Sequence, residues 1–272
     1  MHLLYSRFWH KFLFDLGLVP TSEPYAKRTS HGVILAEGGV KMSKSRPETI
    51  INPDDLVKRF GADALRVYEM FIGPFDQTVA WSMDGLAGAQ RFLEKIWNFY
   101  GQVKLMDCDD GKKPCANAPA GLPQLLHKTV KKVGEDIEAM KFNTAISAMM
   151  IFMNFIGKHE AVPRAAAERF LIILAPFAPH LAEELWQKLC HKQSIFREKW
   201  PEYDPALAQD QTIKLVLQIN GKVRDLVEAA ADIGEEEAKE LALASEKIKK
   251  WLVGKEVKKI IFVKGKLINI VI

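Results

Sequence analysis

Residues 31–55 read HGVILAEGGVKMSKSRPETIINPDD, and this stretch sets the organisation of the N-terminal part of the chain. The apolar run over residues 32–36 predicts a short buried strand. A Gly-Gly pair then opens a loop over residues 41–53, because glycine tolerates backbone angles that other residues avoid. An Asn-Pro-Asp sequence ends the loop. Proline biases its predecessor toward extended geometry and aspartate favours a helix start, so a helix is predicted from Asp54.

Two lysines, Lys41 and Lys44, lie in that loop and are separated by small and hydroxyl-bearing residues. Such a loop can close over a triphosphate, with ammonium groups meeting the phosphate charge and backbone and hydroxyl groups donating hydrogen bonds. When a carboxylate attacks the α-phosphorus of ATP, negative charge builds on the departing pyrophosphate. Fixed cations that meet this charge in the transition state lower the barrier. By composition alone, however, a lysine pair at this spacing is more often a solvated basic loop.

The rest of the chain is mainly helical in its periodicity. Residues 2–17 predict a helix that ends at Gly17, and apolar residues recur at helical spacing in four later segments and beyond a proline pair. These segments are residues 82–100, 126–140, 143–156 and 164–174, with a further run through Leu181, Leu185 and Leu189. Short connections between them predict an antiparallel bundle. Residues 107–123 are polar and rich in turn residues, which indicates a connector.

The period changes after residue 209. Alternating residues over 213–219 are followed by Asn220-Gly221, which supplies the positive backbone angles of a tight type I′ hairpin. One or two helices over 235–252 and a second strand–turn–strand pattern over 257–272 complete a ββααββ or ββαββ unit. Its length suits a small independent domain.

Composition excludes several protein classes. The 272 residues are 48% hydrophobic, 26% charged and 10% aromatic, which is typical of a globular protein and not of a disordered one. A net charge of +4 permits a polyanionic partner, and lysines are concentrated from Lys247 onward. Three cysteines without a C-x-x-C pair favour a reducing compartment, and no signal peptide or membrane span is evident. We therefore expect a cytoplasmic protein without a membrane partner.

Lys41-Met42-Ser43-Lys44-Ser45 resembles the KMSKS signature of class I aminoacyl-tRNA synthetases, and the sequence on both sides is similar to leucyl-tRNA synthetase. The resemblance covers nearly the whole chain, and its motifs occur in the family's order. They are HLLYSRFWHK (2–11), INPDD (51–55), FGADALR (60–66), RFL (91–93), FNTAI (142–146), APFAPHLAEELW (175–186), QINGKVR (218–224) and GKLIN (265–269). The NGKVR and GKLIN pair separates the chain from the valine and isoleucine relatives.

The resemblance implies a mainly α fold of three domains. Residues 1–80 would be the C-terminal part of a Rossmann-type catalytic domain, including the KMSKS loop and a stem-contact region. Residues 81–208 would be an antiparallel helical bundle that binds the anticodon arm, and residues 209–272 a small α+β domain that binds tRNA. The activity implied is leucine–tRNA ligation, in which ATP, with Mg²⁺ bound through its phosphates, drives the attachment of leucine to tRNA(Leu).

The resemblance also assigns residues to roles. Lys44 and Lys41 would be catalytic, with Met42, Ser43 and Ser45 completing the ATP-phosphate loop, and His2 and Tyr5 would lie beside the leucine pocket. The tRNA-binding candidates are Lys128, Lys131, Lys132, Lys222, Arg224, Lys258, Lys259, Lys264 and Lys266, while His180 is expected to pack or cap. No metal site is expected. Pro47-Glu48 stands where the family usually has Gly-Asn, and His31 where it more often has Gln.

Two features of a complete synthetase do not occur in the chain. The HIGH tetrapeptide is absent, since His31-Gly32-Val33-Ile34 lacks the second histidine, and no editing domain is inserted. We therefore expect the chain to make no leucyl-adenylate alone and to need an N-terminal half or subunit that bears HIGH and the editing domain. A split enzyme, a truncated gene and an engineered fragment all fit. The alternatives are a freestanding tRNA- or RNA-binding protein derived from a synthetase, and another class I synthetase.

Overall fold

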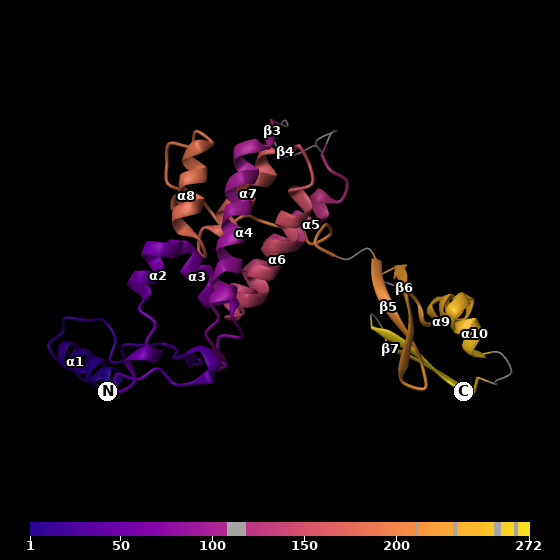
Figure 1. The fold of residues 1–272 in the computed structure, drawn as a ribbon, viewed down its shortest axis with the longest axis horizontal. Coiled ribbons are helices and arrows are strands. Elements are labelled where there is room, and N and C mark those ends of the chain that lie inside the picture. Colours follow the sequence, from indigo (N-terminus) through magenta and orange to yellow (C-terminus); the bar gives the residue numbers. More distant parts are fainter. Residues whose placement is uncertain (108–117, 210–211, 231–232, 253–256, 264–265) are drawn as a thin grey trace. The chain divides into compact units, whose positions relative to one another are not determined.

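A computed structural model describes residues 1–107, 118–209, 212–230, 233–252, 257–263 and 266–272 (Figure 1). The fold is mainly helical, as the sequence predicts, and its described residues form three small sheets. It divides into two compact units. The first combines Met1–Cys108 with Lys132–Lys199, and the second combines Asp109–Lys131 with Trp200–Ile272. The two units are described separately below.

The first unit begins with α1 (His2–Asp15), and Gly17 follows it at φ +71°, the left-handed geometry that commonly ends a helix. The side chains of α1 are tied to the following loop by polar contacts. Arg7 forms a bidentate pair with Glu23 at 2.8 and 2.7 Å, and Lys11 lies 3.2 Å from the same carboxylate. No residue of α1 is buried within the described part of the chain.

The loop region is framed by a short parallel sheet and two helices. Strand β1 (Ile34–Leu35) pairs with β2 (Val79–Ala80), and residue 36 beyond it is buried. Helix α2 (Pro53–Phe60) begins one residue before the predicted position, because the side chain of Asn52 caps it by accepting from the Asp54 amide at 3.1 Å. Helix α3 (Ala62–Phe71) follows directly and packs on α4 and α6.

The helices agree closely with the predicted segments. They are α4 (Met83–Gln102), α5 (Leu122–Glu138), α6 (Phe142–Ile156), α7 (Arg164–Leu174) and α8 (Pro179–Lys188), and the division between the two units falls within α5. Helix α4 starts where the Ser82 hydroxyl accepts from the Gly85 amide at 3.2 Å. In the first unit, Phe152 of α6 stacks on Phe170 of α7 with centroids 5.2 Å apart, and both are fully buried. This contact lies in the core between α6 and α7.

One sheet in the bundle was not predicted. Strand β3 (Lys104–Met106), which continues from α4, pairs in parallel with β4 (Ala161–Pro163), which leads into α7. The two strands have three residues each and lie more than 50 residues apart in the sequence, so no local pattern reveals them. Part of the predicted connector, residues 108–117 with Cys108 and Cys115, falls outside the described residues.

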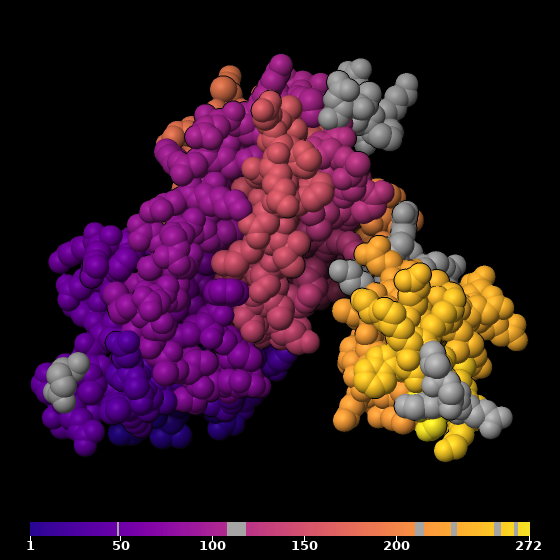
Figure 2. Space-filling view, turned by 45° about the vertical axis from the view of Figure 1, so that its right-hand side comes forward, coloured from indigo at the N-terminus to yellow at the C-terminus, as the bar shows by residue number. Residues whose placement is uncertain are grey.

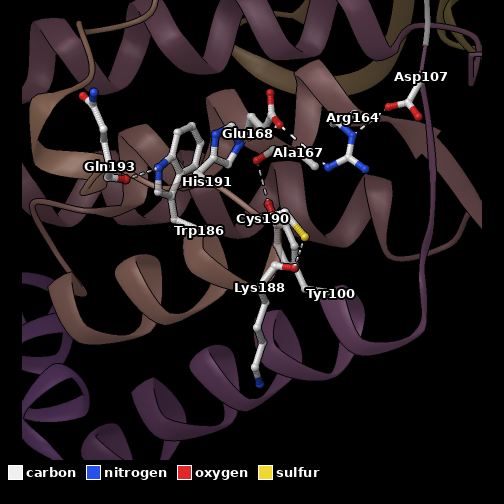
Figure 3. A network of polar contacts seen from close by, with 10 residues as sticks. All are labelled: Tyr100, Asp107, Arg164, Ala167, Glu168, Trp186, Lys188, Cys190, His191 and Gln193. Atoms are coloured by element: carbon white, nitrogen blue, oxygen red, sulfur yellow. Dashed lines mark hydrogen bonds and ion pairs between the residues drawn. The ribbon is translucent and has the colours of Figure 1, made fainter.

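A polar network joins α4, α7 and the end of α8 (Figure 3). The His191 ring stacks on Trp186 with centroids 3.7 Å apart, and its Nε2 lies 2.9 Å from Glu168. The Tyr100 hydroxyl donates to the carbonyl of Ala167 at 2.7 Å, and burial raises the pKa of that phenol well above its ordinary value. Ring stacking, an imidazole–carboxylate contact and a hydroxyl–carbonyl hydrogen bond therefore connect the three helices.

The tail of the chain forms a four-stranded sheet with two helices. The strands are β5 (Thr212–Ile219), β6 (Lys222–Ala230), β7 (Lys259–Val263) and β8 (Leu267–Val271), and the helices are α9 (Glu235–Ala244) and α10 (Glu246–Leu252). The strand order is β6-β5-β8-β7, with β5 and β8 parallel. Asn220 and Gly221 adopt φ +48° and +78° between β5 and β6, which fits the predicted type I′ turn.

The tail has a core of its own. Alternate residues of β5 and β8, among them Leu215, Leu217, Ile268 and Ile270, are fully buried with Ala238, Ala242 and Ile248 of the two helices. In the space-filling view the yellow and orange residues of the tail form a closely packed body (Figure 2). Of the two predicted arrangements, ββααββ and ββαββ, the tail has the first. Within the described residues, none of the helices combines the length and the apolar composition that a membrane span requires.

Candidate functional site

The Lys41–Ser45 loop leaves the buried end of β1 through a glycine turn. Gly38 and Gly39 adopt φ +79° and +78°, angles that residues with a side chain rarely reach. The Ala36 amide donates to the carbonyl of Val40 at 2.7 Å, which closes this turn and returns the chain toward the loop. The two glycines that open the predicted loop therefore adopt left-handed backbone angles, close before Lys41.

The loop ends in a tight turn over Ser43–Arg46. The Arg46 amide donates to the carbonyl of Ser43 at 2.9 Å, so Lys44 and Ser45 occupy the two central positions. The hydroxyls of Ser43 and Ser45 lie 2.8 Å apart, and the Ser45 amide also donates to Ser43 Oγ at 3.3 Å. The side chains of Lys41 and Lys44 are exposed, and no ion pair links either ammonium group to a carboxylate of the described residues.

Thr49, which the sequence analysis did not single out, closes the loop from the other side. Its Oγ1 accepts from the Ser43 amide at 3.3 Å and donates to the carbonyl of Arg46 at 2.8 Å. Pro47 begins the 3₁₀ turn Pro47–Thr49, where its fixed φ suits the first position. The side chain of Glu48, which stands where the family usually has Asn, lies outside the described part.

The segment just before β1 lies too close to Gln77 for a side chain at one position. A Cβ on Gly32 would lie 1.7 Å from the carbonyl oxygen of Gln77, so only glycine fits there. The neighbouring His31 ring is exposed, lies edge-to-face with Phe75, and has its Nδ1 2.6 Å from the carbonyl of Gly32. His31 therefore contacts both its own segment, at Gly32, and the segment that carries Phe75.

His2 and Tyr5, predicted beside the leucine pocket, are exposed on α1. The Tyr5 hydroxyl donates to Met1 Sδ at 3.5 Å, and Tyr5 lines a shallow groove of about 570 Å³. The other residues lining that groove are Leu4, Arg7, Phe8, Trp9 and Lys11. No hydrogen bond among the described residues joins either side chain to the Lys41–Ser45 loop.

The three predicted tRNA-binding lysines of α5 have different surroundings. Lys132 forms an ion pair with Asp136 one turn later, and its Nζ also lies 3.5 Å from Thr144 Oγ1. Lys131 lies over the ring of Tyr203, with Nζ 6.0 Å from the centroid. A buried carboxylate thus partly neutralises the positive charge of Lys132.

The cations of the tail also differ from one another. Lys222, Lys258, Lys259 and Lys266 are exposed, whereas Lys264 falls outside the described residues. Arg224 is partly buried, and its guanidinium carbon lies 3.6 Å from the centroid of the Trp251 ring. Sequence reasoning placed Arg224 near a hairpin turn within reach of phosphate. The contact with Trp251 of α10 gives this side chain a place in the packing of the tail.

Two motifs that lie far apart in the sequence meet beside the bundle. Asp63, in the GADALR segment, is buried and accepts from His180 Nδ1 at 2.8 Å and from the Leu181 amide at 2.7 Å. Arg66, on the same helix, donates to the carbonyl of Pro176 at 2.8 Å. Helix α3 thus holds the corner between α7 and α8.

Among the described residues, no cluster of three or more His, Cys, Asp or Glu could hold a metal ion.

Two families of known proteins match separate parts of the chain. Residues 5–82 match tRNA synthetases of class I for I, L, M and V, and residues 122–241 match the anticodon-binding domain of tRNA ligases. The crystal structure of the Agrobacterium radiobacter K84 agnB2 LeuRS–tRNA–LeuAMS ternary complex is 30% identical, with a TM-score of 0.73. That match covers 100% of this chain and 36% of the LeuRS chain. The resemblance drawn from the motifs is confirmed: the chain belongs to the class I tRNA synthetase family and is of the leucyl type.

Proposed function

We propose that the chain is a component of a leucine–tRNA ligase, which attaches leucine to tRNA(Leu) at the expense of ATP. The observation that carries this proposal is the Lys41–Ser45 loop, which follows the positive-φ pair Gly38 and Gly39 and has two exposed ammonium groups. The likeness to LeuRS over the whole chain supports leucine as the amino acid. Residues 1–80, 81–208 and 209–272 would act as the catalytic part, the anticodon-binding bundle and the C-terminal tRNA-binding domain.

In the proposed reaction the leucine carboxylate attacks the α-phosphorus of ATP, and pyrophosphate leaves. Lys44, at the tip of the turn, and Lys41, at its base, would meet the charge that develops on the leaving group. The Ser43 and Ser45 hydroxyls and the backbone at Met42 would complete the phosphate contacts. An exposed cation pair without a carboxylate partner among the described residues fits a triphosphate, and Mg²⁺ would arrive on the ATP phosphates.

The remaining parts of the active site would come from an N-terminal half or subunit with HIGH and the editing domain. The chain spans 36% of the length of the LeuRS that it matches. Helix α1, which carries His2 and Tyr5, exposes a row of large apolar side chains that such a partner would cover. They include Leu4, Phe8, Trp9 and Phe12, exposed by 69%, 66%, 57% and 46%.

The tRNA would bind to lysines of the bundle and the tail, through phosphate contacts that carry little sequence information. The candidates are Lys128, Lys131 and Lys132 on α5, and Lys222, Arg224, Lys258, Lys259, Lys264 and Lys266 on the tail. Among them, Lys131, Lys132 and Arg224 also make the contacts within the protein described above. The exposed thiol of Cys190 favours the reducing environment of the cytoplasm.

The decisive experiment combines the chain with an N-terminal part bearing HIGH and measures leucine-dependent ATP–pyrophosphate exchange and tRNA(Leu) charging. Lys44→Ala should lower the exchange rate by about 100-fold, as expected for the loss of one charge-stabilising donor. Lys41→Ala should have a smaller effect in the same direction. Lys58→Ala, an exposed lysine on α2, is the matched control and should leave the rate unchanged.

The same experiment separates the proposal from its alternatives. A freestanding RNA-binding protein would bind tRNA with the same affinity whether Lys44 is present or not, and would support no exchange with any partner. The tail, which has its own core, is the observation that favours this second candidate. Exchange that depends on valine, isoleucine or methionine would instead identify another class I synthetase.

A further inference from the structure

The Thr49 side chain joins both limbs of the Lys41–Ser45 loop through a single oxygen atom. At the start of the turn, the Ser43 amide donates to Thr49 Oγ1 at 3.3 Å. At the end of the turn, the same hydroxyl donates to the carbonyl of Arg46 at 2.8 Å. The Thr49 amide donates to that carbonyl as well, at 2.9 Å. The turn that carries Lys44 is therefore fixed at its two ends by one residue outside the signature.

The position of Lys44 depends on these anchors. Lys44 lies between Ser43 and Ser45, and the turn around it is held from inside by the Arg46 amide bond to the Ser43 carbonyl and by the two serine hydroxyls. Thr49 Oγ1 accepts from the Ser43 amide at 3.3 Å, and Ser43 also forms an isolated antiparallel bridge with Arg46. Without the hydroxyl, Ser43 keeps, among the described residues, only its bridge to Arg46, so the turn should open more often.

The returning limb is also stiff. Pro47 has a fixed φ and begins the 3₁₀ turn that ends at Thr49, and the Ile50 amide closes that turn on the Pro47 carbonyl at 3.1 Å. A Gly-Asn pair, which the family usually carries here, lacks this restriction. In this chain the two positive-φ glycines, Gly38 and Gly39, precede the loop, and the Pro47–Thr49 turn follows it.

From this geometry we infer that Thr49 is a positioning residue for the phosphate-binding loop. It makes no contact with the substrate and acts through Ser43 and Arg46, whose spacing sets the turn that presents Lys44. The inference rests on the proposed function, because it assigns Thr49 to the recognition of a leaving pyrophosphate. A preorganised turn meets the phosphate charge without a cost of ordering at the moment of binding.

The test compares Thr49→Val, which keeps the shape and removes the hydroxyl, with Thr49→Ser, which restores the hydroxyl. Hydrogen exchange at the Ser43 amide of the full 272-residue chain should accelerate about tenfold in Thr49→Val, equivalent to a lost hydrogen bond. Thr49→Ser should exchange at the wild-type rate. Thr78→Val, at an exposed threonine, is the control for the change of side chain and should have no effect.

A second measurement on the same variants follows binding of inorganic pyrophosphate by the amide chemical shifts of Lys44 and Ser45. Thr49→Val should raise the dissociation constant about five- to tenfold and Thr49→Ser should restore it, as expected for one net hydrogen bond. Wild-type affinity in Thr49→Val, or loss of affinity in Thr49→Ser, would overturn the inference. If Lys44→Ala binds pyrophosphate like the wild type, the proposed function itself fails, so the two failures are distinguishable.

Discussion

The buried carboxylate of Asp63 lies 2.8 Å from the Nδ1 of His180, 117 residues later in the chain. The second carboxylate oxygen accepts the Leu181 amide, which belongs to the first turn of α8 and has no partner within its own helix. One side chain of α3 therefore caps a helix of the bundle from outside. The GADALR and APFAPH motifs, which sequence comparison treats separately, form a single structural unit.

Replacement of Asp63 should therefore destabilise the first unit. Asp63→Ala leaves the Leu181 amide and His180 without their acceptor, and we expect a loss of about 1–3 kcal/mol in the free energy of unfolding. Urea denaturation followed by circular dichroism measures this loss. Asp76→Ala, at an exposed aspartate, is the control. An equal midpoint for wild type and Asp63→Ala would show that the capping contact contributes nothing.

The contact between α1 and its loop should persist in acid. Hydrogen bonds from Arg7 and then Lys11 lower the pKa of Glu23 from its ordinary 4.5 to about 2. Because the folded-state pKa is depressed, the stabilisation by this carboxylate is present above pH 4.5 and is lost as the pH falls through about 2. Arg7→Ala should raise the pKa more than Lys11→Ala. A ¹³C titration of the Glu23 carboxyl checks both values, and a pKa near 4.5 in the wild type would contradict the ion pair.

The salt dependence of tRNA binding should separate the exposed tail lysines from the paired bundle lysine. Removing Lys222 and Lys266 together should reduce the slope of log affinity against log salt by about two, since each phosphate contact contributes about one. Lys132→Ala should change the slope little, because Asp136 already pairs with that ammonium group. Fluorescence anisotropy with labelled tRNA at several salt concentrations provides the slopes. Equal slopes in the three proteins would remove the tail from the tRNA-binding surface.

Arg224 should stabilise the tail through its contact with Trp251. The guanidinium stacks on the indole at 3.6 Å, a contact that contributes about 0.5–2 kcal/mol in proteins, and lysine does not reproduce its planar geometry. Arg224→Ala and Arg224→Lys should both lower the urea midpoint of the β5 and β8 amides in NMR spectra. A double-mutant cycle with Trp251→Leu isolates the pair. Additive effects in that cycle would show that the two side chains do not interact energetically.

Much of the fold could be predicted from local patterns, because the relevant interactions are local. The apolar stripe over residues 164–174 coincides with α7, and the Asn220-Gly221 pair forms the hairpin whose positive angles it allows. The β3–β4 pair could not be predicted in this way. Its strands are short, and their pairing depends on how α4 and α7 pack.

The candidate site was predictable in part for a similar reason. Lys41 and Lys44 belong to a contiguous signature, whereas the role of Thr49 depends on the return of the chain after Arg46. A threonine four residues beyond a signature has no distinctive sequence pattern. The contact between Asp63 and His180 likewise depends on the tertiary arrangement of α3 and α8, which residue spacing does not encode.

The strand order of the tail has a consequence for protein synthesis. Strand β8 is translated after the other three strands, yet it occupies an inner position between β5 and β7. On the ribosome, the β5–β6 hairpin must therefore wait with one edge of β5 unpaired until residues 267–271 have emerged. A nascent chain that stalls shortly before this point would expose an open, apolar strand edge, the kind of surface that chaperones recognise and that aggregates.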